Sequence, residues 1–71
     1  MITKEQIEEL GGWQDRNGYE YIFDNWEYVY NSKTQTFWNI NDGFGEPELL
    51  VKKVKDYDHL IQIITALNLD I

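Results

Sequence analysis

Two short segments in which aromatic residues alternate with other residues constrain the fold of this chain most strongly. Residues 19–23 read YEYIF and residues 26–30 read WEYVY, and β-branched and aromatic residues at a period of two are typical of β-strands. Only Asp24 and Asn25 separate the segments, and both residue types tolerate the left-handed backbone that a two-residue hairpin loop requires. The sequence therefore predicts a β-hairpin over residues 19–30.

The length of the loop fixes the register of the predicted hairpin. The resulting pairs are Phe23 with Trp26, Tyr21 with Tyr28, and Tyr19 with Tyr30. All six rings then lie on one side of the sheet, which we call the first face. Because this side carries no formal charge, we expect it to face the core.

The chain continues into a further strand through six polar residues, 31–36. The pattern of Tyr30, the polar residues ending in Thr36, and Phe37 resembles the second hairpin of the immunoglobulin-binding domain of protein G. This resemblance implies a loop geometry in which Tyr30 faces Phe37, and it carries no implication of immunoglobulin binding. In that register Phe37 joins the first face. The opposite side, the second face, carries Glu20, Ile22, Asp24, Glu27, Val29, Trp38 and Ile40.

The chain after residue 40 predicts a loop and one more strand. Residues 41–47 contain two glycines and the single proline, which is typical of a loop. Residues 48–54 predict a fourth strand, which we expect at a sheet edge because Lys52 and Lys53 discourage pairing with another chain.

Helices are predicted at both ends of the chain. Thr3 followed by Gln6 matches a capping box, and Ile7 and Leu10 share one side of a short helix that a glycine pair at 11–12 ends. Asp56 is a good N-cap for a longer helix. Its apolar residues recur at helical spacing and are Tyr57, Leu60, Ile61, Ile64 and Leu67.

The element order α-β-β-β-β-α, with the strands in succession, predicts a single α+β domain over residues 1–71. We expect an antiparallel sheet of three to four strands, with the short N-terminal helix and the C-terminal amphipathic helix packed on one face.

Few residues are available for catalysis. The chain has no cysteine, which excludes a catalytic thiol and a thiolate zinc site, and it has a single histidine, His59. His59 follows Asp58 on the predicted helix, where neighbours point about 100° apart, so we interpret it as a solvated surface residue. Glu20 and Glu27 come from adjacent strands and can approach diagonally, which leaves a small carboxylate-dependent hydrolase as an alternative. Our prediction is a non-enzymatic domain without catalytic residue, cofactor or metal.

The charge balance disfavours two further classes of function. Thirteen acids against six bases give a net charge of −7 and a pI near 4.4. This charge is opposite in sign to that of proteins that bind the nucleic-acid backbone directly. The longest apolar stretch, residues 60–69, is about half of the roughly 20 residues that span a membrane, and no secretory signal opens the sequence. We therefore expect a cytoplasmic protein that binds neither nucleic acid nor membrane.

The second face is the candidate binding surface. Ten of the thirteen acids lie within residues 1–48, and several of them surround apolar side chains on this face. The candidate partner-binding residues are Glu20, Asp24, Glu27, Val29, Trp38 and Ile40. An aromatic centre within a rim of carboxylates predicts a partner protein with a basic surface, such as a nuclease or another nucleic-acid-binding protein. A self-assembling structural or accessory domain is the alternative that uses the same face.

The overall layout resembles short, acidic and mostly uncharacterised accessory proteins of phages, prophages and mobile elements of gut-type bacteria. The matching pieces are Ile2 to Glu5 in the first helix, Trp26 to Asn31 in the aromatic hairpin, and Tyr57 to Leu69 in the last helix. The resemblance transfers no catalytic residue. It implies a small binder that blocks a host enzyme, including nucleases of defence systems.

Overall fold

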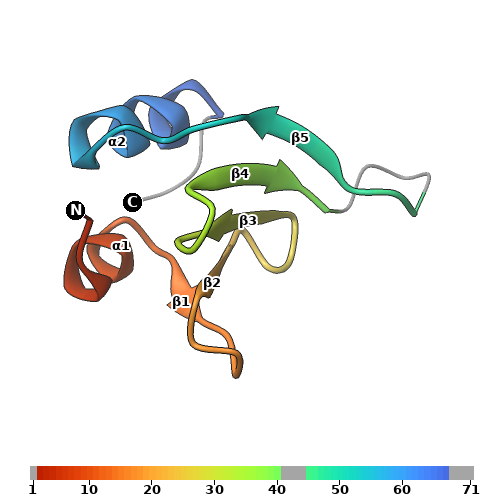
Figure 1. Cartoon of the computed structure of the whole chain (residues 1–71), viewed down its shortest axis with the longest axis horizontal. Coiled ribbons are helices and arrows are strands. Elements are labelled where there is room, and N and C mark those ends of the chain that lie inside the picture. Colours follow the sequence, from red (N-terminus) through yellow and green to blue (C-terminus); the bar gives the residue numbers. More distant parts are fainter. Residues whose placement is uncertain (1, 41–44, 68–71) are drawn as a thin grey trace.

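The computed structural model describes residues 2–40 and 45–67, and within them the chain forms two helices and five strands. The elements are α1 (Lys4–Glu9), β1 (Trp13–Gln14), β2 (Glu20–Phe23), β3 (Tyr28–Asn31), β4 (Thr36–Asn39), β5 (Glu48–Val51) and α2 (Tyr57–Ala66). The strands form one antiparallel sheet in sequence order, from β1 at the bottom of Figure 1 to β5 at the top. The α+β class is confirmed, but the predicted three to four strands are too few.

The additional strand, β1, lies directly after the glycine pair. Trp13 pairs with Ile22 and Gln14 with Tyr21, so β1 forms the edge next to β2. A strand of two residues is too short to show a period of two, which is why the sequence pattern did not predict it. Its pairing with β2 makes Trp13 part of the sheet.

The register of the β2–β3 hairpin differs from the prediction by two residues. Tyr21 pairs with Tyr30 and Phe23 with Tyr28, so four residues, 24–27, form the turn. Asp24, Asn25 and Trp26 all adopt left-handed backbone there, with φ of 51°, 54° and 72°. A shift by two residues keeps each strand residue on its predicted side. Two predicted core residues fall outside the core: Trp26 leaves the strand and is 47% exposed, and Tyr19 precedes β2 and lies outside the core cluster.

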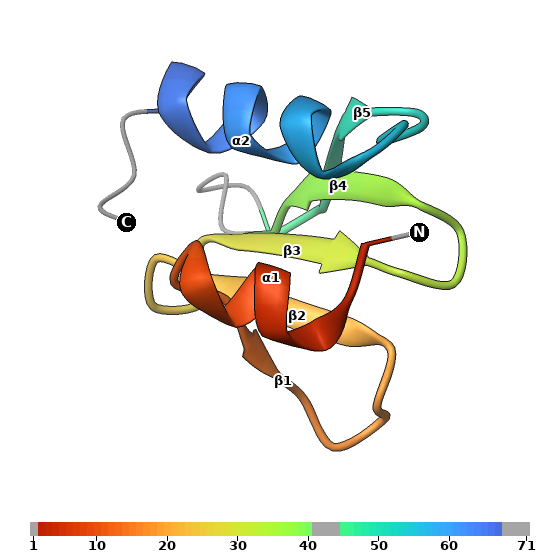
Figure 2. The same cartoon turned by 90° about the vertical axis from the view of Figure 1, so that its left-hand side faces the viewer.

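The first face is the core, as expected, and both helices cover it. Figure 2, which looks onto this side, shows α1 in front of the β1–β3 half of the sheet and α2 at the β5 end. The buried core cluster contains Ile7, Leu10, Tyr21, Phe23, Tyr30, Phe37, Val54, Leu60, Ile63 and Ile64. Tyr28 is partly buried against this cluster, and its ring stacks on Phe37 with centroids 5.9 Å apart.

Local signals at the helix ends are confirmed. The Thr3 hydroxyl accepts a hydrogen bond from the backbone N–H of Gln6, whose side chain accepts one from the Thr3 N–H in return. At the other end Gly11 has φ 95°, and its N–H donates to Glu8 while that of Gly12 donates to Ile7, which is a Schellman motif. Asp56 caps α2 by accepting the N–H of His59 at 2.8 Å.

The remaining strands follow the predicted order. Tyr30 pairs with Phe37, as the resemblance of the β3–β4 hairpin implies. β5 lies at the sheet edge but ends at Val51, and a β-bulge displaces its register between its pairings with Phe37 and Trp38. Of the predicted loop at 41–47, residues 41–44 lie outside the described residues, as does the predicted helical part beyond residue 67.

Candidate functional site: the second face of the sheet

A row of apolar side chains crosses the second face from one edge of the sheet to the other. Successive cross-strand pairs join Trp13 to Ile22, Ile22 to Val29, Val29 to Trp38, and Trp38 to Leu49. We call these five residues the apolar row. Five strands at a spacing of about 4.8 Å give it a length of about 19 Å. Within the described residues no helix covers this side, because α1 and α2 both lie on the first face (Figures 1 and 2).

The middle of the apolar row is nevertheless buried. Ile22 is 1% exposed and Val29 4%, whereas Trp13 at the end of the row is 43% exposed. Trp26 reaches back from the β2–β3 turn, and its ring meets that of Trp13 edge-on with centroids 5.1 Å apart. Trp13 lies beside Ile22 through their pairing, Trp38 beside Val29, and the rings of Trp13 and Trp26 are left in contact with solvent.

Trp13 and Trp26 are site residues that the sequence analysis missed. Trp13 requires the two-residue strand β1, and Trp26 requires the four-residue turn. A signal for Trp13 was present, since a tryptophan directly after a helix-ending glycine pair is an unusual loop residue. No comparable signal marks Trp26, because a bulky residue with positive φ is uncommon.

Carboxylates flank the apolar row on both sides. Glu20 precedes Ile22 by two residues along β2, and Glu27 precedes Val29 by two residues beside the turn, where its carbonyl accepts the N–H of Ile40 at 2.9 Å. Asp24 is exposed in the same turn. The two carboxylates near the turn also act on Tyr28. Burial raises the pKa of the Tyr28 phenol, and the negative charges of Glu27 and Asp24 raise this pKa further.

The observed register separates the two glutamates that were expected to approach each other. Glu20 pairs with Asn31, four residues along β3 from Glu27. At about 3.4 Å per residue this places them about 14 Å apart along the strand, with the apolar row between them. This backbone spacing exceeds the about 5–10 Å between the carboxyl groups of glycosidase pairs, so the register does not bring the two residues into the diagonal contact that was expected.

Four of the six predicted site residues line one pocket. This pocket has a volume of about 240 Å³ and is lined by Glu20, Val29, Asn31, Trp38, Ile40 and Pro47. Trp38 is half-buried, and its indole N–H donates to the Thr36 hydroxyl at 2.8 Å, which fixes the ring along β4. Asp24 and Glu27 lie outside the pocket, on the far flank of the apolar row.

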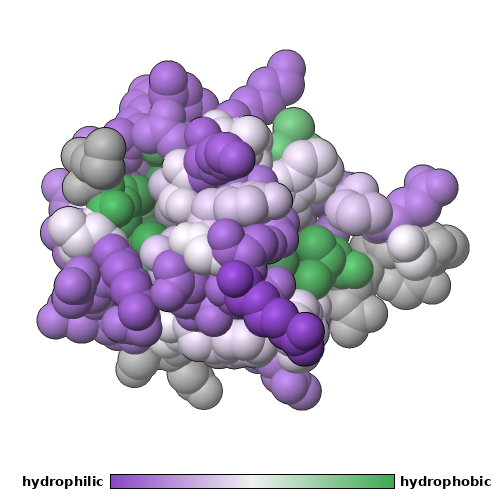
Figure 3. All heavy atoms as spheres, turned by 60° about the horizontal axis from the view of Figure 1, so that its bottom comes forward, coloured by the Kyte–Doolittle hydropathy of each residue, from purple (hydrophilic) through white to green (hydrophobic). Residues whose placement is uncertain are grey.

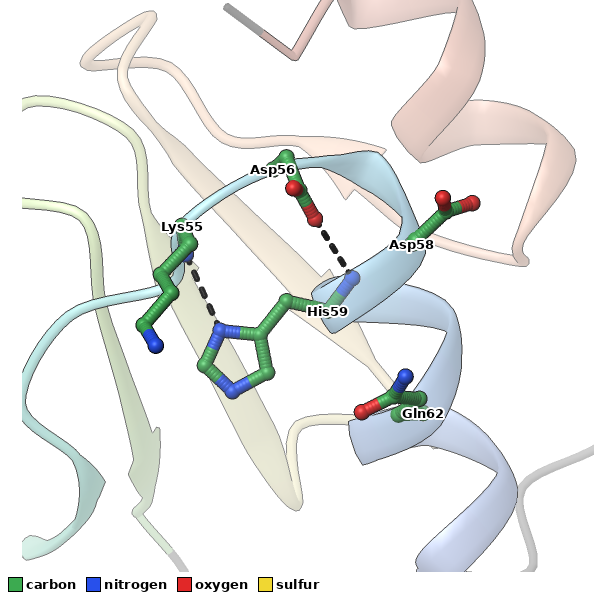
Figure 4. Close-up of a pocket in the computed structure, with 5 residues that line it drawn as sticks. All are labelled: Lys55, Asp56, Asp58, His59 and Gln62. Carbon is green, nitrogen blue, oxygen red and sulfur yellow. Dashed lines mark hydrogen bonds between the residues drawn. The ribbon is translucent and has the colours of Figure 1, made fainter.

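The only histidine lies in a different pocket, and its interactions are structural. This pocket is lined by Lys55, Asp56, Asp58, His59 and Gln62 (Figure 4). His59 Nδ1 accepts the backbone N–H of Lys55 at 3.0 Å, while Asp56 accepts the N–H of His59. Asp58 points away from the imidazole in Figure 4, so the two do not form a base with an orienting carboxylate. The predicted solvated histidine is therefore half-buried and part of the cap of α2.

A third pocket, of about 430 Å³, is lined by Ile2, Tyr21, Tyr30, Ser32, Lys33 and Gln35 and contains none of the six predicted site residues. Residues 2–40 and 45–67 hold no group of three or more metal-ligating side chains, and no helix among them has the length and apolarity to cross a membrane. Figure 3, which brings the β1 end forward, shows a mostly hydrophilic surface with small apolar areas. No family model matches the chain, and no similar protein was found among curated proteins or solved structures.

Proposed function

We propose that this domain is a non-enzymatic protein-binding module that docks through its second face. The observation that carries the proposal is the apolar row, which spans all five strands on the side that no described helix covers. Exposed tryptophans within a polar rim are typical of the centre of a protein interface. The fixed orientation of Trp38 adds to this, because a ring that is already ordered loses little freedom on binding.

The charge of the domain defines the class of partner. Glu20, Asp24 and Glu27 flank the apolar row, and the whole chain has a net charge of −7. A complementary partner surface is therefore basic, whereas a second copy of this chain is repelled by its own charge. Basic surfaces of this kind are typical of nucleic-acid-handling proteins. We propose a cytoplasmic partner of that class, such as a nuclease, whose phosphate-binding surface the domain occupies as an inhibitor.

Capture with matched charge-reversal variants tests this function. The domain is immobilised and exposed to a lysate of the organism that encodes it, at low and at high salt, and bound proteins are identified by mass spectrometry. Replacing Glu20 and Glu27 by Lys reverses the charge beside the apolar row. The control replaces Glu8 and Glu9 by Lys, which makes the same change of charge on exposed residues of α1.

We expect the wild type and the α1 variant to capture the same basic protein, and the second-face variant to lose it. High salt should weaken the capture, because exposed charges are screened over about 8 Å at physiological ionic strength. Equal capture by both variants, or capture that is indifferent to salt, contradicts the proposal. If the lysate yields no partner and sedimentation shows self-association through the second face, the domain is an assembly subunit instead.

A further inference from the structure

The pocket beside Trp38 has the size of a side chain. Its volume of about 240 Å³ lies below the about 300–1,000 Å³ that is typical of small-molecule sites. We propose that it receives one arginine side chain of the partner protein, with the guanidinium held between the Glu20 carboxylate and the face of the Trp38 indole. This inference rests on the proposed function and names the group that the second face recognises.

Glu20 is held in place for such a contact. The side-chain amide of Asn17 donates from its NH2 group to one carboxylate oxygen of Glu20. The side-chain oxygen of Asn17, Oδ1, accepts the backbone N–H groups of Tyr19 and Glu20. Within the described part of the chain no lysine or arginine pairs with Glu20. The carboxylate is therefore fixed by neutral groups, and its charge is still available to a cation from outside.

The hydrogen bonds of the other polar side chains in the pocket favour a cation over an anion. The Trp38 N–H is used by Thr36, so a ligand meets the face of the ring and not its donor. Asn31 is neutral, and its side-chain oxygen accepts the backbone N–H groups of Lys33 and Thr34, so Glu20 is the one charged group among the residues that line the pocket. The pocket thus offers a carboxylate and the negative face of an aromatic ring, which are the groups that attract a cation.

The remaining walls suit the aliphatic part of a long basic side chain. Val29, Ile40 and Pro47 are apolar, and they lie on the same side of the sheet as the carboxylate. Arginine combines an apolar stem with a planar cation that stacks on aromatic rings and is more weakly hydrated than the ammonium of lysine. The stem matches the apolar walls of the pocket, and the planar cation matches the Glu20 carboxylate and the Trp38 ring. We therefore assign the pocket to arginine in preference to lysine.

A titration with single amino acid derivatives tests the assignment without knowledge of the partner. Nα-acetyl-argininamide is added to the ¹⁵N-labelled domain, and Nα-acetyl-citrullinamide, which has nearly the same shape without the charge, serves as the matched probe. The indole N–H signals of the three tryptophans are followed by NMR, with the Trp38 signal assigned by its loss in Trp38→Phe. Trp13 and Trp26 lie outside this pocket and act as internal controls.

We expect saturable shifts of the Trp38 signal with the arginine probe and none with citrulline. Glu20→Gln should weaken the arginine titration about two- to fivefold, the range of an exposed to half-buried ion pair. Glu9→Gln on α1 removes the same charge far from the pocket and should have no effect. Dispersed signals in the same spectra show that each variant is folded.

Three results overturn the assignment: equal shifts with arginine and citrulline, an unchanged titration in Glu20→Gln, or equal affinity for Nα-acetyl-lysinamide when it is titrated in the same way. These results are distinguishable from failure of the proposed function. If the probe does not bind while partner capture still requires Glu20 and Glu27, the second face is a docking surface without an arginine pocket. If capture does not depend on the second face, the proposed function fails whatever the probe does.

Discussion

The two faces of the sheet bury their central side chains by different means. On the first face, Phe37 is 0% exposed because two helices lie over it. On the second face, Ile22 is 1% exposed with no described helix above it, and its cross-strand neighbour Trp13 packs its ring against that of Trp26. Side chains of one layer can therefore keep water from the centre of a small sheet, but the covering rings then stay half in solvent. The first face is buried beneath the helices, and the second face retains partly exposed apolar surface.

The largest expected effect comes from two neighbours on β4 that point to opposite faces. Phe37→Ala should lower the free energy of unfolding by about 3–5 kcal/mol, because a fully buried ring leaves a cavity. Trp38→Ala should cost less than about 2 kcal/mol, because its ring is already half-exposed. Urea denaturation followed by far-UV circular dichroism measures both values. Similar losses at the two positions contradict the distinction between the faces.

The assignment of residues to faces could be read from the sequence, whereas the exact strand pairing could not. Alternation at a period of two marks which side a residue occupies, and a register error of two residues leaves that side unchanged. Tyr21, Phe23 and Phe37 are accordingly where the pattern predicts. The helix caps at Thr3 and Asp56 were equally readable, because each depends on residues within three positions of one another.

The part of the site that was missed depends on backbone geometry that residue types do not report. Turn length in the β2–β3 hairpin is set by three consecutive residues with positive φ, and the third of them is Trp26, a type that seldom adopts this conformation. β1 gains its strand character from pairing with β2 and not from its own two residues. The positions of both Trp13 and Trp26 therefore depend on tertiary structure, whereas Glu20, Val29, Trp38 and Ile40 were placed on the second face from the pattern alone.

The chain directly after α1 packs tightly against the first face at Gly12. A Cβ atom at Gly12 would lie 2.6 Å from Phe23 Cζ and 2.8 Å from Ile7 Cγ2. Gly12→Ala should therefore cost about 1–3 kcal/mol through overpacking. In a Phe23→Leu background the ring tip is absent and the same substitution should cost less, which a double-mutant cycle in urea measures. Additive effects would show that the contact with Phe23 is not the cause.

The first face also buries phenols, which predicts a loss of stability at high pH. Burial raises the pKa of Tyr30 above the ordinary value of 10.0, and the neighbouring Tyr21 raises it further. The unfolded chain then loses this proton first, so the stabilisation is complete below about pH 10 and is lost as the pH rises through the raised pKa. Unfolding free energies between about pH 8 and 11 should fall more steeply for the wild type than for Tyr30→Phe. Trp38→Phe, on the second face, should leave this slope unchanged.

The backbone of Trp26 offers a smaller and more specific test of the second face. With φ at 72°, Trp26 has a left-handed backbone conformation, which is unfavourable for a residue with a side chain and which glycine adopts freely. Trp26→Gly should therefore be more stable than Trp26→Ala by about 1–2 kcal/mol, since both remove the ring and only alanine keeps the backbone cost. Thermal unfolding of the two variants measures the difference. Equal stability would mean that the turn relaxes to another conformation once the ring is removed.

The smallest expected effect isolates the contact between the indoles that cover Ile22. Trp13 and Trp26 meet edge-on at 5.1 Å, an arrangement that is worth about 0.5–1.5 kcal/mol beyond the buried area. Trp13→Ala, Trp26→Ala and the double variant form a cycle whose coupling energy should fall in that range. In each single variant the methyl signals of Ile22 should shift as water reaches its side chain, while those of Ile64, on the buried side of α2, should not. A coupling near zero with an unchanged Ile22 signal would show that the two rings lie side by side without forming a joint cover, and Trp13 would then be free to contact a partner alone.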